Sequence, residues 1–118
     1  YEPDAAVIRA HLVEQLAALL GAAKIGADIA YLTSDTYQAN PLARAYRVTE
    51  VMPFNLKRLN RRLQQMAIGE LIIKKRGFAV DPEQFRRRLK YGGGTAKVVL
   101  VLTHALGRPT AILGEPVP

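Results

Sequence analysis

The sequence contains no cysteine, which excludes disulfide bonds and thiolate metal sites and is compatible with a reducing, cytoplasmic location. No apolar stretch approaches the roughly 20 residues that a membrane-spanning helix needs, so we expect no membrane partner. The two histidines, His11 and His104, lie far apart and in different predicted elements, which gives no zinc-site spacing. The single serine, Ser34, has no nucleophile-elbow pattern around it. We therefore expect no metal site and no catalytic residue in this chain.

A glycine-rich cofactor loop is also missing. The triplet Gly92-Gly93-Gly94 follows a predicted helix and precedes a predicted strand. A phosphate-binding loop needs the reverse order, because its backbone N–H groups and the following helix N-terminus converge on the phosphate. No glycine-rich loop of the dinucleotide or S-adenosylmethionine type occurs elsewhere. We expect no cofactor in this chain, and we expect the triplet to connect a helix to a strand.

Acidic residues are scarce in the second part of the chain. Residues 51–118 hold 13 basic and 4 acidic side chains, whereas residues 1–50 hold 4 basic and 6 acidic ones. Within residues 57–90 alone there are 11 basic and 3 acidic side chains. A field of one sign concentrated in a third of the chain favours a polyanionic partner. The alternative is a basic surface that has no partner.

The first part of the chain predicts a helical lead-in. Asp4 is a suitable N-cap, the apolar residues Ile8, Leu12, Leu16 and Leu19 recur at helical spacing, and Gly21 is placed to end the helix. A loop at 24–28, a short strand at 29–32 and a turn-rich loop at 33–41 follow. We divide the chain into a lead-in or linker at 1–41 and an α/β domain at 42–118. The chain begins at Tyr1 rather than Met, and we expect it to be part of a longer protein.

The second part predicts the element order β-α-β-α-β-β. The predicted strands cover 46–52, 70–76, 96–104 and 110–113, and helices begin after the N-caps Asn55 and Asp81. Asp81 is followed by Pro82 at the first helical position, which is the clearest helix start in the chain. Packing both helices on one face of a four-stranded sheet buries both apolar stripes. The expected fold class is therefore α+β, a two-layer sandwich preceded by an N-terminal helix.

The basic residues of the second part are the candidate site. On the helix after Asn55 they lie opposite the apolar stripe, and this helix has no acidic residue to relieve the like-charged i,i+4 pairs. Further basic residues end the strand at 70–76 and surround the helix after Asp81. The alternatives are a solvated face for the first group and protection of a strand edge for the second. The predicted RNA-binding residues are Lys57, Arg58, Arg61, Arg62, Lys74, Lys75, Arg76, Arg86 and Lys90.

No row of exposed aromatic residues accompanies these basic side chains. Phe54 and Tyr91 flank predicted elements, and Phe85 is expected in the core. This disfavours base stacking of the single-strand kind and favours recognition of backbone and shape, as in structured RNA.

Five segments together resemble a known family. VMPFNLKRL (51–59), GELIIKKRG (69–77) and VDPEQFRRRL (80–89) resemble the THUMP-like domain at the C-terminus of bacterial class I S-adenosylmethionine-dependent methyltransferases. EPDAAVIRA (2–10) and AYLTSD (30–35) resemble the stretch that joins that family's catalytic domain to its C-terminal domain. The resemblance covers nearly the whole chain.

This resemblance implies an accessory domain. THUMP domains are associated with RNA binding and modification, and the family's S-adenosylmethionine site lies in a catalytic domain that this chain lacks. The implied function is RNA binding within a parent methyltransferase, with structured RNA and the parent's catalytic domain as partners. The alternative is a structural domain that docks on the catalytic domain or dimerises, which predicts an exposed apolar patch on the first helix. The sequence does not indicate an oligomeric state.

Overall fold

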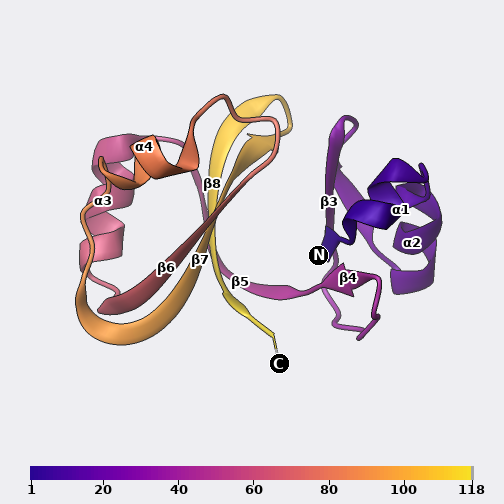
Figure 1. Cartoon of the computed structure of the whole chain (residues 1–118), viewed down its shortest axis with the longest axis horizontal. Helices are drawn as coiled ribbons and strands as arrows, with labels where there is room; N and C mark the ends of the chain where they lie inside the picture. Colours follow the sequence, from indigo (N-terminus) through magenta and orange to yellow (C-terminus); the bar gives the residue numbers. More distant parts are fainter. Residues whose placement is uncertain (118) are drawn as a thin grey trace.

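The computed structural model describes residues 1–117 (Figure 1). Its elements are β1 (Glu2–Pro3), α1 (Ala5–Arg9), α2 (Val13–Leu20), β2 (Ala23–Gly26), β3 (Ile29–Thr33), β4 (Ala43–Arg44), β5 (Tyr46–Pro53), α3 (Leu56–Gln64), β6 (Ile68–Lys75), α4 (Pro82–Arg86), β7 (Gly93–Ala105) and β8 (Arg108–Pro116). Residues 1–44 are called the N-terminal unit below. The rest of the described chain forms the main sheet with α3 and α4.

The main sheet has the strand order β5-β8-β7-β6. Strand β8 pairs antiparallel with both β5 and β7, whereas β6 and β7 run parallel. Parallel neighbours need a crossover connection, which here contains α4. In Figure 1, α3 and α4 lie on one face of the sheet and the N-terminal unit lies on the other. The predicted α+β class, with its β-α-β-α-β-β order and two helices on one face, is confirmed.

The main core lies between the sheet and its two helices. Leu59 and Leu63 of α3 are fully buried there, together with Phe85 of α4 and the inward side chains of the strands. Both predicted N-caps are present: the Asn55 side chain accepts from the backbone N–H of Arg58 at 2.9 Å, and Asp81 caps α4. The apolar stripe of α3 is therefore fixed against the sheet, and its opposite side faces outward.

Helix α4 is shorter than the sequence predicts. It ends at Arg86, although Leu89 is still buried. The backbone N–H of Leu89 donates to the Arg86 carbonyl, an i→i−3 bond that tightens the last turn. The Asn60 side chain of α3 then bonds the backbone on both sides of Leu89. The Arg88 carbonyl and the Lys90 N–H thus bond a side chain of α3 and are not part of a helix that continues beyond Arg86. The predicted strand entry at the glycine triplet is present, since β7 begins at Gly93, but the prediction that the triplet follows the helix directly is wrong, because α4 ends at Arg86.

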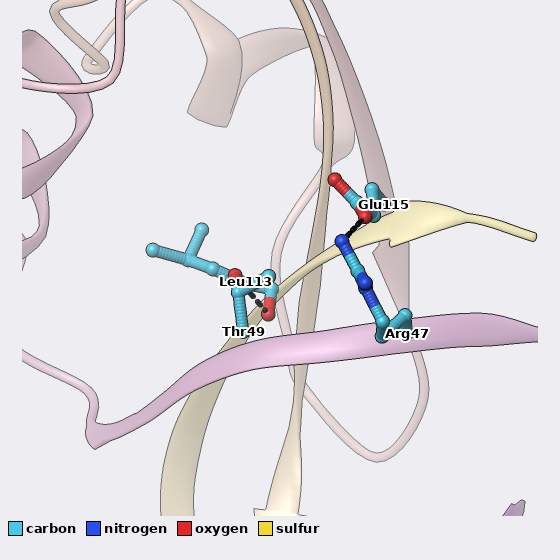
Figure 2. Close-up of polar contacts among 4 residues, drawn as sticks. All are labelled: Arg47, Thr49, Leu113 and Glu115. Carbon is cyan, nitrogen blue, oxygen red and sulfur yellow. Dashed lines mark hydrogen bonds and ion pairs between the residues drawn. The ribbon is translucent and has the colours of Figure 1, made fainter.

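Edge strand β5 contains a β-bulge opposite β8 (Figure 2). The pairing register shifts between Val48 and Glu50, so Thr49 has no partner residue in the ladder. The Thr49 hydroxyl donates to the Leu113 carbonyl at 3.1 Å. This bond gives the Leu113 carbonyl a side-chain partner at the position where the ladder is irregular. The extra residue also changes which side chains share a face. Val48 and Val51 are three positions apart, yet both lie on the open face of the sheet.

The bulge needs a glycine on the neighbouring strand. A Cβ atom on Gly114 would lie 2.6 Å from the backbone oxygen of Arg47, which is too close for any side chain. The Arg47 side chain crosses to Glu115 on β8 and forms an ion pair with it (Figure 2). The open face of the sheet at this end is therefore shaped by a local irregularity.

The N-terminal unit differs from the single predicted helix. The helix breaks at His11, whose φ of 58° lies in the left-handed region, and the Leu12 N–H donates to the Val7 carbonyl. This is a Schellman motif with histidine in the place usually taken by glycine. Part of the predicted loop at 24–28 is strand β2, which pairs with β3, and β1 pairs with β4. Long-range pairing within the unit therefore creates strands that local patterns do not predict.

The N-terminal unit has a small core of its own. Its buried side chains are Val7, Leu16, Ala17, Leu20 and Leu32. Two larger apolar side chains, Leu12 and Leu19, are 47% and 65% exposed. Of the helices within residues 1–117, none has the length and apolar character needed to cross a membrane.

Candidate nucleic-acid interface

Helix α3 presents a cationic side to solvent because its apolar stripe is buried. Lys57, Arg58 and Arg61 are exposed, and within residues 1–117 no carboxylate lies within salt-bridge distance of any of them. Arg58 and Arg61 are three positions apart, and Lys57 and Arg61 are four apart, so these side chains are neighbours on the helix surface. Their mutual repulsion is not compensated by acidic groups in this part of the molecule.

Asn60 joins this helix to the chain that follows α4. Its side-chain nitrogen donates to the Arg88 carbonyl at 3.0 Å, and its oxygen accepts from the Lys90 N–H at 2.8 Å. Both Arg88 and Lys90 are exposed, and neither forms an ion pair within the described residues. The structure thus holds the backbone of two further basic residues beside α3. We call Lys57, Arg58, Arg61, Arg88 and Lys90 the α3 basic surface.

Arg62 and Arg86 are engaged in contacts within the protein. The Arg62 Nε lies 2.6 Å from Glu50 Oε2 on β5, in a half-buried ion pair. One Arg86 nitrogen donates to the Leu71 carbonyl at 2.8 Å and to the Tyr91 hydroxyl at 3.2 Å. Arg86 therefore ties α4 to β6, and Arg62 ties α3 to the edge strand β5.

The three basic residues at the end of β6 do not join the α3 basic surface. Lys74 lies 3.3 Å from Glu2 of the N-terminal unit, and the Arg76 guanidinium lies 5.6 Å from the centre of the Tyr31 ring. Both face the side of the sheet opposite α3. The Lys75 ammonium is exposed and donates to the Val80 carbonyl at 2.5 Å. Alternation along the strand thus divides these charges between the two faces of the sheet.

A cleft lies between the N-terminal unit and the open face of the main sheet. Its volume is about 800 Å³, and both units contribute to its walls. Tyr31 lines it from β3, and burial raises the pKa of its hydroxyl to about 12, with Glu2 adding to the rise and Arg76 opposing it. Tyr31 is therefore uncharged at neutral pH.

Arg88 and Asn60 are not among the site residues predicted from the sequence. The cleft was not predicted either. The role of Asn60 follows from two long-range hydrogen bonds that no local pattern indicates. Arg88 lies two positions from each of two predicted site residues, Arg86 and Lys90, but on the helix predicted here the basic side chains point in different directions. The tyrosines of the cleft lie in the first 46 residues, outside the segment that carries most of the basic residues.

The described residues show no constellation for metal binding. Within residues 1–117, no three His, Asp or Glu side chains gather closely enough to hold a metal ion. Ser34 bonds the Gly21 carbonyl and the Thr36 hydroxyl, which is a turn role. His104 contacts the Gly77 carbonyl.

Comparison with known proteins decides the family. A family model described as THUMP domain-like matches residues 43–116, which include the whole main sheet with α3 and α4. The chain belongs to the THUMP domain-like family. The predicted resemblance to this family is thereby confirmed.

Relatives of the THUMP-like chain are larger proteins. Over 100 residues it is 36% identical to two uncharacterized S-adenosylmethionine-dependent methyltransferases of Mycobacterium tuberculosis, from strains CDC 1551 / Oshkosh and ATCC 25618 / H37Rv. The match covers 85% of this chain and 27% of each relative, so the chain spans about a quarter of their length. The chain therefore corresponds to one part of these larger relatives.

A solved structure has the same fold. A protein from Porphyromonas gingivalis W83, proposed to be a methyltransferase, matches the THUMP-like chain with a TM-score of 0.82 at 24% identity. The match covers 100% of this chain and 29% of that protein. The N-terminal unit and the main sheet therefore occur together in a larger protein.

Proposed function

We propose that this THUMP-like chain is a non-catalytic, RNA-binding accessory domain of an S-adenosylmethionine-dependent methyltransferase. The observation that carries the proposal is the α3 basic surface, five exposed cations without a carboxylate partner among residues 1–117. Clustered lysines and arginines on one face match the regular negative charge of a nucleic-acid backbone. Structured RNA, recognised through its phosphates and shape, is the proposed ligand.

The parent protein supplies the chemistry in this proposal. S-adenosylmethionine is held by a catalytic domain elsewhere in the parent, and the THUMP-like domain presents cytoplasmic RNA to it. The size of the relatives, of which this chain matches 27%, supports such a division of labour. The residues proposed to contact RNA are those of the α3 basic surface. Arg62, Lys74, Lys75, Arg76 and Arg86, also predicted from the sequence, already have partners within the protein.

The test is the salt dependence of binding to a hairpin RNA, measured by fluorescence anisotropy at several salt concentrations. Each phosphate contact contributes a slope of about −0.7 to −0.9 to log K against log salt. Replacing Arg58 and Arg61 with Ala should reduce the slope by about 1 to 2 units and weaken all sequences alike. The matched control removes two exposed cations elsewhere, Lys97 and Arg108, and should leave the slope unchanged.

Two outcomes contradict this proposal. Absence of binding at low salt would exclude RNA as the ligand of the chain. Binding whose slope responds equally to both double variants would show that net charge, and not the α3 basic surface, determines affinity.

A docking or dimerisation function is the second candidate. The exposed Leu12 and Leu19 of the N-terminal unit support it, because this is where an apolar patch was predicted for a docking domain. The measurement is sedimentation velocity of the chain over a range of concentrations. A dimer that Leu19→Ser dissociates would favour this function. A monomer at all concentrations would exclude dimerisation.

A further inference from the structure

The cleft between the N-terminal unit and the main sheet has the size of a ligand site. Its volume of about 800 Å³ falls within the range of small-molecule and cofactor pockets. The floor is the open face of the sheet, formed by Val48, Val51, Val99, Val101 and Ile112. The opposite wall comes from β3 and the loop that follows it. An apolar floor with polar groups at its margin suits a planar ligand that has an aromatic face and hydrogen-bonding edges.

Tyrosines gather at this cleft. The chain has 5 tyrosines, and four of them, Tyr1, Tyr31, Tyr37 and Tyr46, line it. The three phenylalanines lie instead against the core on the other face of the sheet. Tyrosine combines an aromatic face with a hydroxyl, so it serves a surface that is partly apolar and partly wet. The segregation of the two aromatic types therefore marks the cleft as a different environment from the core.

Tyr37 is the tyrosine best placed to receive a ligand. It is 55% exposed and lies in the loop after β3, whereas Tyr31 is only 5% exposed and forms part of the packed wall. On the sheet side, Val48 and Val51 are 51% and 59% exposed. Both valines face the cleft only because of the bulge at Thr49. An aromatic ring and two exposed valines thus line the same opening from two units.

Charged groups at the margin complete the site. Arg47 lies beside Val48, and its side chain is 71% exposed although it pairs with Glu115. An exposed pair of this kind is weak, so the guanidinium is available to a phosphate. Asp35 and the hydroxyl of Thr36 also line the cleft and supply acceptors for amino or hydroxyl groups.

We propose that this cleft binds an unpaired RNA base, which stacks on Tyr37 over the valines of β5, while Arg47 contacts a flanking phosphate. This inference rests on the proposed function, since it assigns an unpaired nucleotide of the bound RNA to a second site. The α3 basic surface lies on the other side of the sheet, with edge strand β5 between the two. Such stacking does not select a base sequence, because every base has a π-face.

The absence of tryptophan makes the test direct. Intrinsic emission of this chain comes from its tyrosines, four of which line the cleft, so a stacked base should quench it. The probe is a single-stranded oligoadenylate of about six nucleotides, within the usual site size for such strands. The matched probe is an abasic oligomer of the same length, which has the same phosphates and no bases. We expect saturable quenching with the oligoadenylate and little with the abasic oligomer.

Variants of Tyr37 connect the signal to the cleft. Tyr37→Ala should weaken binding of the oligoadenylate by about tenfold or more, whereas Tyr37→Phe keeps the stacking face and should bind like the parent chain. Thermal unfolding of each variant checks the fold, which the exposed position of Tyr37 leaves unaffected. The double variant Arg58→Ala with Arg61→Ala should lower the affinity for hairpin RNA. It should leave the Tyr37-dependent preference for the oligoadenylate over the abasic oligomer unchanged.

The outcomes separate this proposal from the proposed function. Equal affinity for the oligoadenylate and the abasic oligomer would overturn the cleft proposal, as would an unchanged affinity in Tyr37→Ala. In either case, hairpin binding that depends on the α3 basic surface would still support the proposed function. Quenching that depends on Tyr37, without salt-dependent hairpin binding, would support the cleft and overturn the α3 interface.

Discussion

The N-terminal unit and the main sheet with its helices differ in core, charge and aromatic content. The core of the main sheet contains twelve buried residues, and that of the N-terminal unit contains five. All five cations of the α3 basic surface lie with the main sheet, whereas three of the four tyrosines at the cleft belong to the N-terminal unit. Burial of apolar side chains thus stabilises the main sheet more than the N-terminal unit. The main sheet and its helices also carry the cationic face. The smaller unit turns the open face of that sheet into a cleft.

The largest difference should appear in core truncations. Leu63→Ala removes a fully buried side chain from the larger core and should cost about 3–5 kcal/mol of unfolding free energy. Leu20→Ala acts on the smaller core of the N-terminal unit, which can relax more readily, and should cost about 2–3 kcal/mol. Urea unfolding followed by circular dichroism measures both. A neutral Leu63→Ala would mean that α3 is turned with its basic side inward.

The contact between the two regions should weaken at high pH. Tyr31 has its pKa raised to about 12 by burial, while in the unfolded chain it loses its proton near pH 10. Between these values the folded state holds a proton that the unfolded state has lost, so stability is full below about pH 10 and falls as pH rises towards 12. The loss should reach up to about 3 kcal/mol. Urea unfolding at several alkaline pH values measures it, and Tyr31→Phe should flatten the profile. A profile as steep in Tyr31→Phe would assign the loss to other groups.

A smaller effect is expected where α3 meets the chain after α4. Asn60→Ala removes two hydrogen bonds to backbone groups and should cost about 1–2 kcal/mol. It should also weaken hairpin RNA binding, because Arg88 and Lys90 lose their fixed place beside α3. Thermal unfolding and anisotropy titration test the two effects. As a control, Gln64→Ala alters an exposed position of the same helix and should leave both unchanged.

The smallest stability effect is expected on the α3 basic surface itself. Replacing Arg58 and Arg61 with Ala relieves repulsion between neighbouring cations, worth a few tenths of a kcal/mol for each like-charged pair. The midpoint of thermal unfolding should therefore stay level or rise slightly, even though RNA binding weakens. A fall of more than about 1 kcal/mol in unfolding free energy would assign these arginines a structural role.

Some of this architecture follows directly from local sequence patterns. The caps at Asn55 and Asp81, the strands of the main sheet and the outward face of α3 were predicted, because each depends on residues close together in the chain. The N-terminal unit was predicted poorly. Strands β1, β2 and β4 have two to four residues and exist through pairing with distant partners. The break at His11 uses a left-handed histidine where a glycine would have signalled it.

Local patterns and composition are enough to predict the order of elements in the main sheet, the excess of positive charge in residues 57–90 and the side of α3 that carries it. Which of the predicted basic residues have partners depends instead on tertiary contacts. Glu2 pairs with Lys74, and Glu50 pairs with Arg62, through contacts between separate secondary-structure elements. Tertiary packing also forms the cleft, because a bulge and a second unit bring side chains from distant segments to one surface. Periodicity reports which way a side chain points from its own element, whereas its neighbours depend on how the elements pack.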